Sequence, residues 1–270
     1  MISTKNNIIE EIEKDIESLA AGEPSYIEIK DNIIYTVNKL KQNLKIKKLF
    51  KGILDRFLSL IIDEMKFIRK IAENEYYSKD HYRTDSDIVD IFSKFYTLID
   101  LYRSIKGVKN CEIPDIDDNE IGFFDTLRNM YTHLFTHLNK KKLEYKRIVG
   151  WIDIGIKNKY ISKYDYWEYS EEKDRLEIKN ERIFRKKYKE FSTAVLNVSI
   201  HDWYQDAQGP CIKIIIWIEE PCEHKQWNKL IVFVNKSEIF EWFRFMNKSA
   251  IKVFEKIEPW FKEKVLKSKI

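Results

Sequence analysis

Apolar residues recur at helical spacing through most of the first 160 residues of this 270-residue chain. From about Asp31 to Tyr77, and again from Thr84 to Gly107, they return every three or four positions, as the buried face of an α-helix requires. The whole chain contains only seven Gly and five Pro, so few residues interrupt these helices. Residues 30–160 are therefore expected to be almost wholly helical and to form an antiparallel bundle.

The spacing changes after about residue 160, where short runs rich in Ile and Val indicate strands. The two strongest such runs are Cys211–Glu219 and Lys229–Val234, and Arg175–Lys179 and Ser192–Trp203 also look like strands. Helical spacing then returns, and Pro259 is expected to kink or restart that helix. We predict a mainly α fold with an α+β carboxy-terminal part. Residues 1–160 would be the helical bundle, and residues 161–270 a small antiparallel sheet of three or four strands covered by carboxy-terminal helices.

Composition is typical of a folded soluble protein, with 44% hydrophobic and 34% charged residues and a formal charge of +4. No apolar run reaches the ~18 residues that a membrane-spanning helix needs, so no membrane partner is expected. Three cysteines are too few for a disulfide framework, which favours the cytoplasm. Cys211, Cys222 and His224 lack a fourth ligand at the spacing of a zinc module, so neither a metal nor another cofactor is expected.

The segment Arg128–His133 combines a permanent cation, a carboxamide and an imidazole within about one and a half helical turns. Asp117 and Glu120 predict the start of its helix as a capping box. The apolar residues of this helix fall on one arc and leave Arg128, Asn129, His133 and His137 on the opposite one. Arg can bind a phosphate through its fork of donors, His can transfer protons near neutral pH, and Asn can orient either partner. These residue types suffice to cleave a phosphodiester without a metal. The alternative is an ordinary solvated helix face.

This pattern, Arg128-Asn129-x-x-x-His133 on a helix that follows other helices, resembles the signature of the HEPN superfamily. Many members of this superfamily are metal-independent ribonucleases of bacterial defence and toxin systems. The resemblance covers at most residues 30–160. It implies RNA cleavage by attack of the ribose 2′-hydroxyl, with Arg128, Asn129 and His133 as the catalytic residues. It also implies a homodimer, because members with one motif per chain generally pair two motifs across an interface.

Two further groups of residues are candidates beside the motif. His137 lies outside the family's spacing and is an auxiliary proton-transfer group or a polar neighbour. A basic track follows the motif and is a candidate RNA-binding surface; it consists of Lys140, Lys141, Lys142, Lys146 and Arg147. The same cations would also favour the negative end of a helix dipole.

Two other functions remain open from the sequence. The chain can be a non-enzymatic helical binding or sensor module, or the regulatory partner of a toxin, such as an antitoxin. The first expectation is an endoribonuclease of an anti-phage defence or toxin system, with RNA as substrate and an antitoxin or defence protein as partner.

Overall fold

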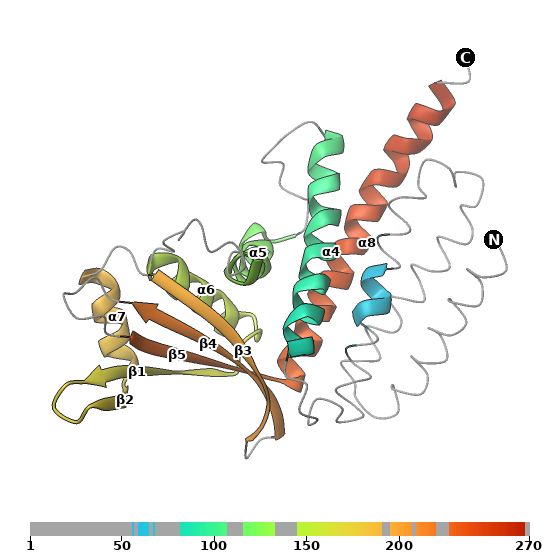
Figure 1. The fold of residues 1–270 in the computed structure, drawn as a ribbon. Coiled ribbons are helices and arrows are strands. Elements are labelled where there is room, and N and C mark those ends of the chain that lie inside the picture. Colours follow the sequence, from blue (N-terminus) through green and yellow to red (C-terminus); the bar gives the residue numbers. More distant parts are fainter. Residues whose placement is uncertain are drawn as a thin grey trace. The chain divides into compact units, whose positions relative to one another are not determined.

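The computed structural model describes residues 56, 59–64, 67, 82–106, 116–132, 145–190, 195–206, 209–219 and 227–267 (Figure 1). Most of the predicted helical stretch from Asp31 to Tyr77 therefore lies outside the described residues. Elsewhere before residue 160 the described segments are helical, as predicted.

The chain divides into two compact units. The helical unit combines residues 1–75, 90–116 and 240–270, and the sheet unit combines residues 76–89 and 117–239. The boundary expected at 160/161 falls inside the sheet unit in this division. The helix that carries Arg128 therefore belongs to the same unit as the sheet.

The described part of the helical unit is built on aromatic contacts between helices far apart in sequence. Its long helices are α4 (Tyr82–Lys106) from Asp90 onward and α8 (Lys236–Lys267) from Phe240 onward. Ring centroids lie 5.5 Å apart for Phe92 and Trp242, and 6.0 Å apart for both Phe95–Phe245 and Phe67–Phe243. Helix α8 continues through Pro259, so this proline does not restart the helix, and the alternative expectation of a kink stays a prediction.

The sheet unit contains five antiparallel strands in the order β2-β1-β5-β4-β3. The strands are β1 (Lys163–Ser170), β2 (Arg175–Lys179), β3 (Val195–Asp206), β4 (Gly209–Glu219) and β5 (Trp227–Asn235). The predicted antiparallel sheet is confirmed, but its three or four strands are corrected to five. The additional strand is β1, whose Tyr and Trp residues favour strands although it contains no aliphatic residue.

One face of the sheet, here called the inner face, is buried. Its residues on β4 and β5 are 0% exposed; they are Ile212, Ile214, Ile216, Ile218, Asn228, Leu230, Val232 and Val234. Helix α5 (Asp118–Thr132) contacts β3, α7 (Glu181–Glu190) contacts β1, and α6 (Tyr145–Lys157) contacts both helices. We predicted that carboxy-terminal helices cover the sheet. Instead, α5 and α6 precede the strands in sequence, and α8 from Phe240 onward belongs to the helical unit.

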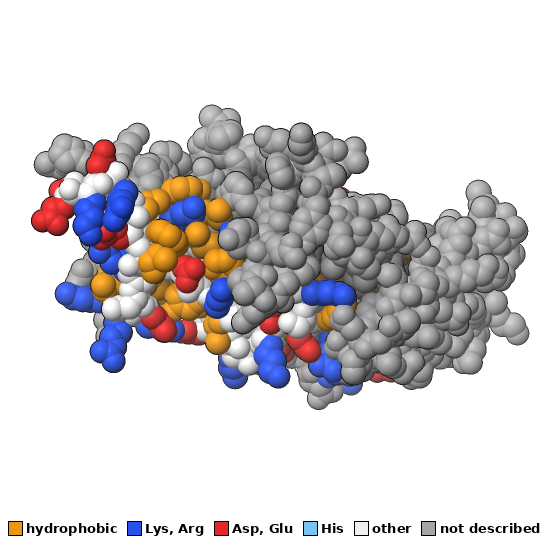
Figure 2. All heavy atoms as spheres, turned by 90° about the horizontal axis from the view of Figure 1, so that it is seen from below, with side chains coloured by type: hydrophobic (Ala, Val, Ile, Leu, Met, Phe, Trp, Pro, Cys, Tyr) orange, Lys and Arg blue, Asp and Glu red, His pale blue; other side chains and the backbone are white. Residues whose placement is uncertain are grey.

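The alternate residues of β1, β5 and β4 form the opposite, outer face of the sheet. Ile215, Ile231 and Phe233 make a small apolar cluster there that is itself buried, with the partly buried Trp167 and Trp217 packed against it. Figure 2 shows hydrophobic side chains gathered over this part of the molecule, with Lys, Arg and acidic side chains among and around them. The two faces therefore differ in composition, because the outer one combines aromatic and aliphatic residues with charged ones.

Candidate functional site

Helix α5, which carries Arg128 and Asn129, begins with a side-chain cap. The Asp117 carboxylate accepts a hydrogen bond from the Asn119 backbone N–H at 2.8 Å, as an N-cap aspartate does. Glu120 accepts the Tyr160 hydroxyl at 2.6 Å, which ties the first turn of α5 to the loop after α6. The predicted start of this helix at Asp117 is confirmed.

The apolar face of α5 packs into an aromatic cluster of the sheet unit. Phe123 stacks on Trp151 of α6 with ring centroids 5.1 Å apart and planes 9° apart. The ring centroids of Phe124 and Tyr160 lie 5.2 Å apart, and Leu127 is 0% exposed. Because rigid rings hold α5 from one side, the orientation of its opposite, polar side is also fixed.

Arg128 and Asn129 occupy that polar side and are partly buried. The Arg128 guanidinium Nη2 lies 2.8 Å from the Asp125 carboxylate and donates a hydrogen bond to the Asn129 Oδ1 at 3.3 Å. The side chains of Arg128 and Asp125 are 23% and 29% exposed, so water still reaches this pair. The structure thus brings together two of the three predicted catalytic residues and adds Asp125, one helical turn earlier.

The remaining predicted residues are described only in part. His133, His137, Lys140, Lys141 and Lys142 lie outside the described residues, as do Cys222 and His224. Lys146 and Arg147 belong to the first turn of α6. Their proposed roles stay predictions.

Asp125 could have been found from the sequence, because it precedes Arg128 by three residues on a helix, and residues three apart are neighbours on a helix surface. It changes the chemistry of the site in two ways. The carboxylate restricts the rotamers of the guanidinium, and it also offsets part of its positive charge. A phosphate that binds Arg128 must therefore join or compete with this carboxylate.

A separate cleft of about 590 Å³ lies along α6, β1 and α7. Arg185 lines it and is held by Asp153 at 2.7 Å and by Glu181 at 2.6 Å. Burial, followed by the nearby carboxylate of Glu181, raises the pKa of the Tyr164 hydroxyl to about 12. Arg128 and Asn129 do not line this cleft. Because its arginine is engaged by two carboxylates, we interpret the network as a tie between α6 and α7 rather than as an anion site.

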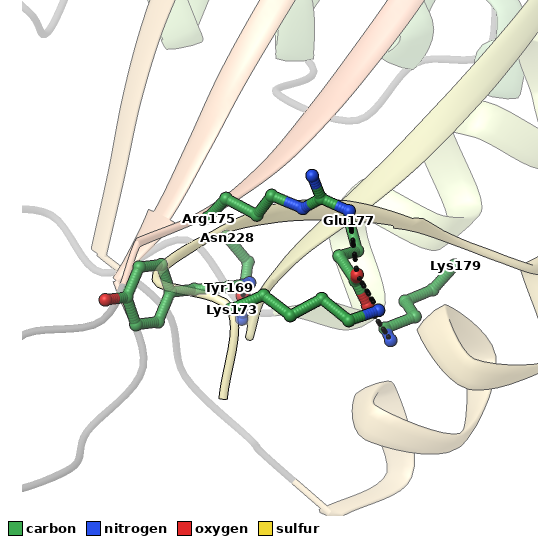
Figure 3. Close-up of polar contacts among 6 residues, drawn as sticks. All are labelled: Tyr169, Lys173, Arg175, Glu177, Lys179 and Asn228. Carbon is green, nitrogen blue, oxygen red and sulfur yellow. Dashed lines mark hydrogen bonds and ion pairs between the residues drawn. The ribbon is translucent and has the colours of Figure 1, made fainter. Parts of the chain in front are cut away.

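The β1–β2 hairpin carries a third polar cluster (Figure 3). Glu177 accepts hydrogen bonds from the Lys173 and Lys179 ammonium groups at 2.6 and 3.2 Å, and Arg175 lies 3.8 Å away. These hydrogen bonds lower the pKa of the Glu177 carboxyl below its usual value. Beside it, the fully buried Asn228 accepts the Tyr169 backbone N–H at 3.1 Å and so ties β5 to β1. This cluster was not predicted from the sequence, because it depends on the register of the hairpin.

The described residues contain no group of three or more His, Cys, Asp or Glu side chains that could hold a metal ion. Within the same residues, no helix is both long and apolar enough to cross a membrane. Comparisons of the chain with models of protein families, with curated proteins and with solved structures gave no match.

Proposed function

We propose that this protein is a metal-independent endoribonuclease that cleaves RNA through the ribose 2′-hydroxyl. The observation that supports the proposal best is the position of the Arg128 guanidinium. It lies between the Asp125 carboxylate and the Asn129 carboxamide, on a helix fixed by an aromatic cluster. A preorganised cation of this kind stabilises charge that develops on a phosphate in the transition state. The resemblance of the Arg128–His133 segment to the HEPN signature agrees with this chemistry.

In the proposed reaction, His133 accepts the proton of the 2′-hydroxyl, whose oxygen then attacks the adjacent phosphorus. The bond from phosphorus to the 5′-oxygen breaks, and the leaving oxygen takes up a proton from the protonated imidazole or from a second group such as His137. The products are a 2′,3′-cyclic phosphate and a free 5′-hydroxyl. Arg128 stabilises the pentacoordinate phosphate, and Asn129 orients Arg128 through the contact of 3.3 Å.

The proposal includes a homodimer, since the chain carries one such motif, and the HEPN resemblance implies that two motifs meet across an interface. It places the protein in an anti-phage defence or toxin system, where an antitoxin or defence protein is the expected partner. The non-enzymatic binding or sensor module remains the competing proposal. Loss of cleavage with preserved folding in Arg128→Ala and His133→Ala would support the ribonuclease over the binding module.

Cleavage of single-stranded RNA by the full-length protein is the direct test. Activity should persist in EDTA and disappear with a substrate that carries 2′-deoxyribose at the scissile position, because the nucleophile is then missing. Arg128→Ala should lower kcat by about 10²–10³-fold, and His133→Ala by about 10²–10⁴-fold. Arg128→Lys should not restore activity, since an ammonium lacks the planar fork.

Two variants serve as controls for this test. Arg175→Ala removes an exposed arginine of β2 and should leave cleavage unchanged. Cys222→Ser should be nearly silent. Cleavage of DNA, dependence on added magnesium, or an active His133→Ala protein would each contradict the proposed mechanism. Absence of RNA cleavage by the folded wild-type protein would favour the binding module instead.

Asp125 provides a sharper test of the described geometry. Asp125→Asn keeps an oxygen acceptor three residues before Arg128 but removes the negative charge that competes with a phosphate. We expect KM for RNA to fall, because Arg128 becomes a stronger electrostatic partner, and kcat to fall as well, because the guanidinium is held less firmly. Steady-state kinetics at several substrate concentrations separate the two effects. Unchanged KM and kcat would mean that the Asp125–Arg128 pair only stabilises α5.

A further inference from the structure

The outer face of the sheet has a regular arrangement of aromatic and basic residues. Strand register places three residues in each cross-strand row over β1, β5 and β4. The three rows are Lys163–Phe233–Lys213, Asp165–Ile231–Ile215 and Trp167–Lys229–Trp217. Three of these nine positions are lysines and one is an aspartate, so the three rows carry a net charge of +2.

Each of the three lysines lies against an aromatic ring of the same face. The Lys163 and Lys213 ammonium groups lie 4.8 and 5.7 Å from the Phe233 ring centroid, and the Lys229 ammonium lies 5.1 Å from that of Trp217. Such cation–π contacts hold the charged groups above the face instead of directing them outward. The basic and aromatic groups therefore form one continuous surface.

This surface also concentrates positive charge. Burial first, and then repulsion from Lys213, lowers the pKa of the Lys229 ammonium below its usual value. Two ammonium groups that repel each other over an apolar floor would be stabilised by an anion placed between them. Charge complementarity thus favours a partner with several negative charges.

The aromatic residues restrict the chemistry of that partner. Trp167 and Trp217 are only partly buried and stand at the two ends of one row, with Lys229 between them. An acidic peptide would satisfy the ammonium groups but offers few flat rings for two indoles. A single-stranded nucleic acid offers both, since its bases stack on aromatic side chains while its phosphates bind lysines.

We propose that the outer face of the sheet, formed by Trp167, Trp217, Phe233, Lys163, Lys213 and Lys229, binds single-stranded RNA. Bases stack on the two indoles, and the lysines leave the ring faces to contact phosphates. This surface belongs to the same unit as Arg128 but does not include it. Binding here therefore needs no cleavage and goes beyond the proposed ribonuclease activity.

Binding is best measured with the full-length Arg128→Ala protein, which leaves the RNA intact. The probe is a fluorescein-labelled oligouridylate of about twelve nucleotides, within the span that single-strand-binding surfaces cover. Fluorescence anisotropy over a series of salt concentrations gives both affinity and its salt dependence. Lys213→Gln with Lys229→Gln should weaken binding by about tenfold or more. The double variant should also reduce the slope of log K against log salt by about 1.4, since each phosphate contact on a single strand contributes about 0.7.

Substitutions of Trp167 test stacking separately from charge. Trp167→Leu should weaken binding by about 5- to 150-fold, and Trp167→Phe should retain most of the affinity because it keeps a flat ring. The control is the double variant Lys173→Gln with Lys186→Gln, which removes two positive charges from the β1–β2 hairpin and α7 and should bind like the parent protein. Circular dichroism and thermal unfolding confirm that each variant is folded.

Several outcomes would overturn this inference. They are unchanged binding by the Lys213/Lys229 variant, equal loss in the Lys173/Lys186 control, and equal affinities of Trp167→Leu and Trp167→Phe. Displacement of the RNA by polyglutamate as efficiently as by unlabelled RNA would point to an acidic protein partner.

The inference and the proposed function can fail independently. RNA binding that depends on the outer face, without cleavage by the wild-type protein, overturns only the ribonuclease. Cleavage of RNA together with RNA binding that is unchanged in the outer-face variants overturns only this inference.

Discussion

The two compact units differ in their carboxylates with shifted pKa values, because Glu64 of the helical unit is buried whereas Glu177 and Glu181 of the sheet unit lie beside cations. In the helical unit, Glu64 is 1% exposed and accepts a hydrogen bond from the Asn247 side-chain amide at 2.9 Å. Burial, opposed by that hydrogen bond, raises the pKa of Glu64 to about 8. In the sheet unit, Glu177 and Glu181 lie at the surface beside lysine and arginine, and hydrogen bonds from those cations lower their pKa values.

This difference shows two ways in which a fold accommodates acidic residues. The helical unit keeps Glu64 mostly neutral near pH 7, because burial makes the ionised carboxylate less stable than the protonated carboxyl. The sheet unit keeps its carboxylates ionised and uses them to connect neighbouring elements. The two units should therefore respond to pH with opposite sign.

The largest expected effect is on the stability of the helical unit. The folded-state pKa of Glu64 lies above its ordinary value of 4.5, so the folded unit binds an extra proton between pH 4.5 and 8. Its stability should be greatest at the acid end of this window and fall as pH rises through 8, by at most about 5 kcal/mol. Urea unfolding at pH 5, 6.5 and 8.5, with pulsed hydrogen exchange of peptides from α8, measures this slope.

Glu64→Gln should abolish the slope, since the amide resembles the protonated carboxyl and can still accept from Asn247. Glu255→Gln, at an exposed position of α8, should keep the wild-type slope. A slope that persists in the Glu64→Gln protein would assign the pH response to another group and remove one side of the comparison.

The second effect concerns the aromatic packing of the sheet unit. Gly155 of α6 has no space for a side chain, because a Cβ there would lie 2.7 Å from Ile161 Cγ1 and 2.9 Å from Phe123 Cε2. Gly155→Ala should destabilise this unit by about 1–3 kcal/mol through overpacking and leave the pH slope of the helical unit unchanged. Thermal and urea unfolding, with hydrogen exchange of peptides from β5, measure the loss.

Gly150→Ala is the matched control on the same helix, since a Cβ there meets nothing within 4 Å. It should stabilise the unit by about 0.5–1 kcal/mol, because alanine is the better helix former. If the two alanine variants had equal stability, the close contact of α6 with α5 would not hold in solution. The fixed orientation of Arg128 would then lose its structural basis.

Much of this unit follows from local sequence patterns. Helix α5 was predicted from its cap and from the apolar arc that contains Phe123, Phe124 and Leu127, all three of which are buried. Strands β2, β4 and β5 were predicted from their composition. Strand β1 was not predicted, because its tyrosines alternate with charged residues and it contains none of the aliphatic residues that indicate the other strands.

The candidate sites were only partly predictable. The spacing of Arg128 and Asn129 was visible in the sequence, but the role of Asp125 was not considered. The outer face could not be assigned from sequence, since Trp167, Lys229 and Trp217 meet only when β1, β5 and β4 pair in one particular register. A shift by one residue would move each of them to the inner face.

The smallest effect is expected in the cleft network of the sheet unit. Arg185 binds Asp153 and Glu181, but the three side chains are 41%, 50% and 57% exposed, so water and salt screen the charges. A double-mutant cycle with Asp153→Asn and Arg185→Gln should give a coupling free energy of about 0.2–1 kcal/mol that decreases with added salt. Because the pKa of Glu181 is lowered, this carboxylate contributes to the stability of the folded unit above pH 4.5, and the contribution is lost as pH falls further. The pH dependence of stability from Glu181 is therefore opposite in sign to that from Glu64. A coupling free energy well above 1 kcal/mol that does not depend on salt would show that the network is shielded from water. The environments of Glu181 and Glu64 would then differ less than the exposure of the Arg185 network indicates.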